Sequence, residues 1–82
     1  MDERTKAIYK FISDFWQLIK KYIELPNTDE EWDTLTDEAS ELSKKHKAGD
    51  TPESQFFNKC IVDWLEYLNK REIRRKKGTE DP

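Results

Sequence analysis

The sequence predicts an all-α fold, a three-helix bundle, and three observations lead to this prediction. Apolar residues recur at helical spacing in three segments of the 82-residue chain. Two breaks that contain proline, at residues 25–27 and 47–52, separate these segments, and helix start signals follow each break. No run alternates polar and apolar residues for long enough to form a strand. We therefore expect helices over about residues 3–25, 29–47 and 52–75.

These helices are expected to form one domain over residues 1–77, with residues 78–82 as a flexible C-terminal tail. A chain of this length has no room for a second core. It also buries only about 60% of the surface that its unfolded form exposes, so its stability depends on a few large side chains or on assembly. Ten aromatic residues supply such side chains.

The first segment, residues 3–25, has the widest apolar arc. A surface helix usually buries a stripe a little over 100° wide, whereas the apolar residues here cover about 200° of the circumference. We therefore expect this helix to be contacted from more than one side. Its apolar residues are Ala7, Ile8, Tyr9, Phe11, Ile12, Phe15, Trp16, Leu18, Ile19, Tyr22, Ile23 and Leu25.

The second segment, residues 29–47, has a strong start signal and a narrow apolar stripe. Thr28 and Glu31 are spaced as a capping box, and Asp29 and Glu30 suit the positive end of a helix dipole. The stripe covers only about 80°, and we expect this helix to lie across a single groove. It consists of Trp32, Leu35, Ala39 and Leu42.

The third segment, residues 52–75, is again wide. Gly49 suits a left-handed cap that ends the helix before it, Thr51 suits an N-cap and Pro52 the first helical position. The apolar arc covers about 180°. It contains Phe56, Phe57, Cys60, Ile61, Trp64, Leu65, Tyr67 and Leu68.

The unequal width of these stripes is the basis of the functional prediction. One narrow helix cannot cover two wide ones, so apolar surface is left over on the first and third helices, and such surface marks an interface. We expect a homodimer with a core shared between the first and third helices of both chains, because two-fold self-association is the commonest assembly. Large aromatic side chains dominate such interfaces. The candidate anchors are Tyr9, Phe11, Trp16, Trp64 and Tyr67.

Side chains that could carry chemistry do not form a recognisable catalytic or metal-binding pattern. His46 lies among lysines, which disfavours a metal ligand, and is expected to be an ordinary histidine near a helix end. Cys60 lies among aromatic residues, where burial raises the pKa of a thiol. Asp63 borders the apolar arc and is expected to pair with a basic residue at the interface. We therefore expect a protein that is not an enzyme and has no cofactor, metal or small-molecule substrate.

Charge is distributed unevenly and leaves two further interpretations open. The net charge is −3, yet residues 26–53 carry nine acidic and three basic groups. Six basic residues lie within residues 70–77. They favour the dipole at the end of a helix and would pair with the acidic face of the second helix, or they bind nucleic acid in a salt-dependent way. The candidate nucleic-acid contacts are Lys70, Arg71, Arg74, Arg75, Lys76 and Lys77.

The second interpretation concerns the acidic helix. A row of carboxylates can imitate a phosphate backbone and act as a decoy for a nucleic-acid enzyme, although a solvated polar face is the ordinary explanation. The acidic residues in question are Asp29, Glu30, Glu31, Asp33, Asp37, Glu38 and Glu41.

Cysteine content and hydropathy predict a cytoplasmic location. A single cysteine allows no internal disulfide, the apolar clusters are interrupted too often for a membrane span, and the charged start of the chain does not suit a signal peptide. We expect the partner to be a second copy of the chain or another protein, and not a membrane.

The stretches of residues 11–16 and 62–68, which alternate with Lys/Glu-rich faces, resemble the small, acidic, helical orphan proteins of prophages and mobile elements in Gram-positive bacteria. The resemblance concerns general character and assigns a role to no individual residue. It implies a phage-like accessory or interaction protein without catalytic activity.

Overall fold

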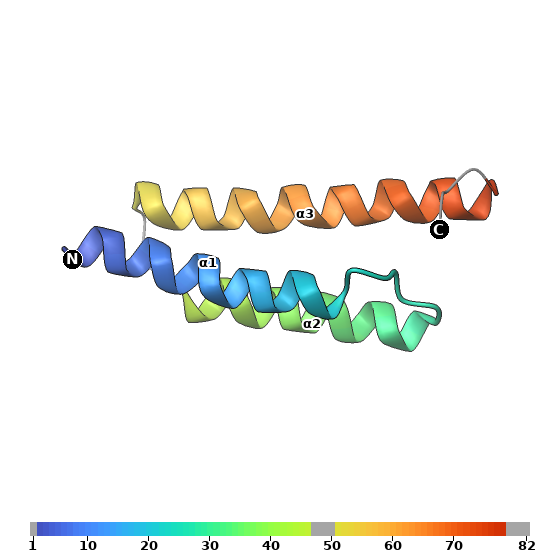
Figure 1. Ribbon diagram of the computed structural model, residues 1–82, viewed down its shortest axis with the longest axis horizontal. Coiled ribbons are helices and arrows are strands. Elements are labelled where there is room, and N and C mark those ends of the chain that lie inside the picture. The colour runs from blue at the N-terminus through green and yellow to red at the C-terminus, as the bar shows by residue number, and fades with distance from the viewer. Residues whose placement is uncertain (1, 47–50, 79–82) are drawn as a thin grey trace.

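The computed structural model describes residues 2–46 and 51–78. It contains the α-helices α1 (Glu3–Lys21), α2 (Asp29–Lys45) and α3 (Pro52–Lys76). Each helix packs against the other two. Figure 1 shows that α1 and α3 run in the same direction and that α2 runs in the opposite direction. The predicted three-helix bundle is confirmed.

Side-chain caps fix where the helices begin. Thr28 Oγ1 accepts a 3.1 Å hydrogen bond from Glu31 N, and Thr51 Oγ1 accepts one of 3.2 Å from Ser54 N. Both N-caps were predicted from sequence. The carboxylate of Glu31 accepts from Asn27 N at 2.8 Å, one residue before the cap. Asp2 caps α1 by accepting a 2.7 Å hydrogen bond from Thr5 N, and this cap was not predicted from the sequence.

The helix ends differ modestly from the predicted ones. α1 ends at Lys21 and not near Leu25. Pro26 disfavours helical backbone at Leu25 and has no N–H to donate to the carbonyl of Tyr22, so the helix cannot continue through Leu25. Leu25 is nevertheless buried. α2 ends at Lys45, and α3 extends one residue further than predicted, to Lys76.

Three predicted features lie outside the described residues. They are the end of the second helix at residue 47, the cap at Gly49, and residues 79–82 of the expected tail.

The core lies between the three helices and has a regular spacing. Phe11, Leu35 and Leu68 are its most deeply buried large side chains, one from each helix. α2 contributes Leu35, Ala39 and Leu42 of the predicted narrow stripe, and the fourth member, Trp32, is partly buried against the core. The core residues of α1 and α3 recur at intervals of three and four, as in helices packed side by side. They are Phe11, Phe15, Leu18 and Tyr22 at the end of α1, and Phe57, Ile61, Trp64 and Leu68 of α3.

Candidate protein interaction surface

Large apolar side chains remain exposed on two of the three helices. Among the described residues, all eight lie on α1, on α3 or in the turn directly after α1, and none lies on α2. The unequal stripe widths predicted this distribution. The eight are Tyr9, Ile12, Trp16, Ile23, Phe56, Val62, Tyr67 and Ile73.

The five candidate anchors divide into two groups. Tyr9, Trp16 and Tyr67 are 64%, 52% and 54% exposed, so their side chains are accessible to a partner. Phe11 is fully buried and Trp64 is 8% exposed, so the prediction that these two contact a partner is wrong.

The reason is that both rings are used inside the single chain. The Phe11 ring stacks on Phe57 of α3 with centroids 4.2 Å apart. Trp64 meets Phe15 of α1 edge to face at 5.7 Å. These contacts join α1 to α3 and leave no exposed surface on Phe11 and only a small part of Trp64, which lines the groove between the two helices.

A second apolar stripe runs along α1 beside the core stripe. Its intervals of three and four residues repeat those of the core, and each member follows a core position by one residue, which turns the stripe by about 100°. We call it the outer stripe of α1. It consists of Tyr9, Ile12, Trp16 and Ile19, and Ile23 continues it beyond the helix end.

α3 has a matching outer stripe that precedes its core positions by one residue. Phe56 and Tyr67 are exposed, and Cys60 between them is partly buried. Burial raises the pKa of the Cys60 thiol, as predicted. Asp63 occupies the same stripe, and its carboxylate lies 3.8 Å from Lys59 Nζ on the same helix.

The two outer stripes meet in a groove between α1 and α3. In two parallel helices packed side by side, the residues that follow the core positions of one helix lie next to the residues that precede the core positions of the other. The outer stripe of α1 follows its core positions and that of α3 precedes them, so the two stripes adjoin. The groove is lined by Ile19, Tyr22, Ile23, Trp64, Tyr67, Leu68 and Arg71. We define the α1/α3 face by its eight apolar residues, Tyr9, Ile12, Trp16, Ile19, Ile23, Phe56, Cys60 and Tyr67.

Cations lie over two of the exposed rings of this face. Lys20 Nζ is 5.8 Å from the centre of the Trp16 ring, and Arg71 Cζ is 5.7 Å from that of Tyr67. Such contacts are worth about 0.5–1 kcal/mol at exposed sites. They favour particular positions of the two rings on the surface, which lowers the entropy that a partner must remove on binding.

Two of the six basic residues near the end of α3 are structural. Arg71 Nη1 donates to Ile23 O at 2.9 Å. Arg75 donates to Pro26 O at 2.8 Å and to Asn27 Oδ1 at 3.3 Å, and it also pairs with Glu72. These hydrogen bonds go to the connection between α1 and α2. The sequence had instead suggested that the basic residues pair with the acidic face of α2. Partners 48 or 49 residues apart could not be read from local patterns.

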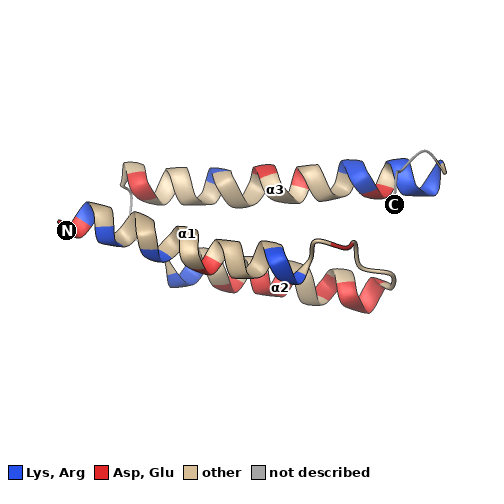
Figure 2. Cartoon of the chain, viewed as in Figure 1, with Lys and Arg blue, Asp and Glu red and all other residues tan. Residues whose placement is uncertain are grey.

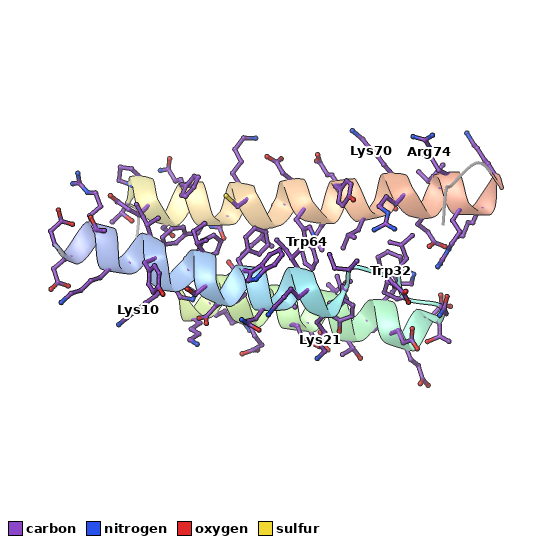
Figure 3. The ribbon with its side chains drawn as sticks, viewed as in Figure 1. Lys10, Lys21, Trp32, Trp64, Lys70 and Arg74 are labelled. Carbon is purple, nitrogen blue, oxygen red and sulfur yellow. The ribbon has the colours of Figure 1, made fainter. Side chains whose placement is uncertain are left out.

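The remaining basic residues face outward or along α3. Figure 3 shows Lys70 and Arg74 pointing away from α1 and α2. Lys76 Nζ lies 4.0 Å from Glu72, and Lys77 is exposed at the helix end. In Figure 2 this end of α3 is the most strongly basic part of the chain, whereas α2 is rich in acidic residues.

Two carboxylates of α2 bind groups outside that helix, and a third, Glu41, lies 3.9 Å from Lys44 on the same helix. Glu38 accepts from Lys21 Nζ at 2.8 Å and from the Tyr22 hydroxyl at 2.7 Å, and Glu31 accepts from Asn27 N. The row of acids that could act as a decoy is therefore partly engaged in joining α2 to α1 and to the chain before it.

His46 is placed by packing and by one acid. Its Nε2 lies 2.8 Å from Asp14 Oδ2 of α1, and its ring meets Phe11 edge to face at 5.5 Å. Lys45 Nζ contacts the same Asp14 oxygen at 2.9 Å. Hydrogen bonds from Lys45 and His46 hold the pKa of Asp14 below its usual value. His46 is thus the C-cap of α2, as its position near a helix end predicted, and it joins α2 to α1.

The α1/α3 face offers apolar and aromatic surface, which binds by desolvation and packing. Within residues 2–46 and 51–78, no three histidine, cysteine or acidic side chains gather where they could hold a metal ion. None of the described helices combines the length and the apolar character needed to cross a membrane.

Comparison with protein families, with curated proteins and with solved structures finds no match to this chain.

Proposed function

We propose that this chain is a non-enzymatic helical protein–protein interaction module that self-associates through the α1/α3 face. The observation that carries the proposal is the second apolar stripe of α1, which repeats the spacing of the core stripe yet remains largely exposed. A helix with two such stripes has one more than its own bundle can cover.

The chemistry of the face suits a protein partner. Trp16, Tyr9 and Tyr67 are large, stiff side chains that bury much area at a low entropic cost, and residues of this kind carry most of the energy of an interface. Fully burying a large apolar side chain contributes about 1.5–3 kcal/mol, and roughly half of that remains to be gained by one that is half exposed. Trp16 lies near the middle of the outer stripe of α1, where a contact residue is best shielded from water.

Two glutamate substitutions on α1 test the proposal. Trp16→Glu places a charge in the middle of the face, and we expect it to weaken self-association at least tenfold. Lys10→Glu is the matched control, because Lys10 is exposed about 140° around the helix from the centre of the outer stripe. The control changes the net charge by more than Trp16→Glu does, so a general charge effect would appear there first.

Sedimentation velocity over a range of micromolar concentrations measures the result, and circular dichroism checks that each variant is still helical. The proposal predicts a dimer for the wild type and for Lys10→Glu, and a shift toward monomer for Trp16→Glu. A wild-type protein that remains monomeric at every concentration would contradict it, as would a dimer that Trp16→Glu leaves intact.

A further inference from the structure

We propose that the partner on the α1/α3 face is a second copy of the chain turned end for end, with the two-fold axis perpendicular to the helices. This inference rests on the proposed self-association and adds the orientation of the partner. It follows from the direction of the helices, the size of the face and the charges at its two ends.

The face has two different ends because α1 and α3 are parallel (Figure 1). Both helices begin at one end of the bundle and finish toward the other. Their dipoles therefore point the same way, with the positive ends together at the start of the face and the negative ends together toward its finish. A second copy can lie on this face either in the same direction or in the opposite one.

The apolar part of the face is too small to bind alone. From Tyr9 to Ile23 the outer stripe of α1 is about 20 Å long, and two helices side by side are about 20 Å wide. The apolar part thus covers roughly 400 Å², whereas a standard interface buries about 800 Å² on each partner. A stable dimer must also bury surface beyond the apolar residues, so the charged ends of the face take part in the contact.

The two ends of the face carry opposite charges on the outer stripes. On α3 the stripe continues past Tyr67 to Lys70, Arg74 and Lys77, all of which are exposed. At the other end the stripes begin with Asp2 before α1 and Glu53 in α3. Glu53 also pairs with Arg4 at 2.9 Å, a residue that lies on the core side of α1 and not on the outer stripe.

These charges favour the antiparallel dimer. Copies lying in the same direction would gather the three basic residues of both chains at one end of the dimer, and like charges brought together at an interface cost binding energy. Copies lying in opposite directions place Lys70, Arg74 and Lys77 over the half of the partner's face that begins with acidic residues. The opposed helix dipoles favour this arrangement as well.

A distance between two spin labels tests the orientation. The variant Cys60→Ala with Lys77→Cys carries one nitroxide per chain, near the basic end of the face. The outer stripe of α3 runs from Glu53 to Lys77, which corresponds to about 36 Å of helix. Pulsed dipolar spectroscopy should therefore give a separation of about 36 Å or more between the two labels. A separation below roughly 20 Å, the distance across two packed helices that lie in the same direction, would overturn the orientation.

A second measurement needs no label. Removing two positive charges with Lys70→Gln and Lys77→Gln should weaken the dimer several-fold at low salt if it is antiparallel, because attraction is lost. If the dimer were parallel, the same change would strengthen it, because repulsion is lost. Lys10→Gln is the control and should leave the dissociation constant unchanged. Tightening of the dimer, or no change in its affinity, overturns the inference.

The outcomes separate this inference from the proposed function. A dimer with a short label distance, or one tightened by the two Lys→Gln changes, leaves self-association standing and rejects the end-for-end arrangement. Monomeric wild-type protein rejects both.

Discussion

The hydroxyl of Tyr22, at the end of α1, donates a 2.7 Å hydrogen bond to Glu38 of α2, and Lys21 Nζ contacts the same carboxylate oxygen at 2.8 Å. Burial, together with the hydrogen bond to Glu38 and the charge of that residue, raises the pKa of Tyr22 to about 12. The contact joins the two helices beside the groove between α1 and α2, which Lys21 and Glu38 line.

Tyr22→Phe should alter the dependence of stability on alkaline pH. The pKa of Tyr22 in the folded protein lies above its unfolded value of about 10. The stability that Tyr22 contributes is therefore complete below pH 10 and is lost as the pH rises toward about 12. The variant should be about 1 kcal/mol less stable than the wild type at neutral pH. As the pH rises, its stability should fall less steeply than that of the wild type. Urea unfolding across this pH range measures the effect, with exposed Tyr9→Phe as the control. Parallel curves for wild type and Tyr22→Phe would count against the contact.

Asp14→Asn should change the acid limb of the stability profile. Hydrogen bonds from Lys45 and His46 lower the pKa of Asp14 in the folded state, so its contribution is present above the unfolded pKa and is lost as the pH falls through the folded pKa. The variant should be less stable than the wild type at neutral pH, and the two should converge in acid. Thermal unfolding at several pH values measures this, with exposed Asp33→Asn as the control. A constant difference at all pH values would refute the prediction.

Phe11→Ala should weaken folding, whereas Tyr9→Ala should weaken assembly. Phe11 is fully buried, and removing a core phenylalanine costs about 3–5 kcal/mol, a large part of the stability of a small domain. Tyr9 is exposed, so Tyr9→Ala should change the stability of the monomer by less than about 0.5 kcal/mol while weakening self-association. Denaturant unfolding of dilute protein and sedimentation of concentrated protein separate the two effects. Equal loss of stability in both variants would contradict the assignment of Phe11 to the core and Tyr9 to the face.

Arg75→Ala should destabilise the fold by about 1–2 kcal/mol, because its guanidinium holds the carbonyl of Pro26 and the side chain of Asn27. Lys70→Ala, a change of the same charge at an exposed position of α3, should have almost no effect on the unfolding of the monomer. Denaturant unfolding of both variants at low protein concentration compares them. Similar stabilities would show that the contact of Arg75 with the α1–α2 connection contributes nothing.

Local signals in the sequence were sufficient to predict the helices and two of their caps. Thr28 and Thr51 act on amides three residues away, so their role depends on nothing distant. The narrow stripe of α2 was also predictable, because Trp32, Leu35, Ala39 and Leu42 are the only apolar residues between Asp29 and Lys45. The same counting predicted that exposed apolar surface would lie on α1 and α3.

The choice between adjacent stripes could not be predicted. On α1 the stripe with Phe11 and the stripe with Tyr9 and Trp16 have the same spacing and similar residues, so helix periodicity alone does not say which faces inward. The stacking of Phe11 on Phe57 decides it, and that contact is fixed only when α3 packs against α1. Trp64 was assigned to the interface for the same reason.

Contacts between distant residues were also beyond a reading of the sequence. Asp14 and His46 are 32 residues apart, and Arg75 is 49 residues from Pro26. A basic run near a helix end suggested dipole pairing or nucleic-acid binding, whereas Arg71 and Arg75 are used to hold the connection between α1 and α2. Such roles depend on where the helices end in space.

Amide chemical shifts, followed on dilution of ¹⁵N-labelled protein, show whether a second copy covers the α1/α3 face. We predict concentration-dependent shifts at Tyr9, Ile12, Trp16 and Tyr67, and constant shifts at exposed positions of α2 such as Asp33 and Ser40. Shifts that do not change with concentration, or that change on α2 and not on the α1/α3 face, would contradict self-association through this face.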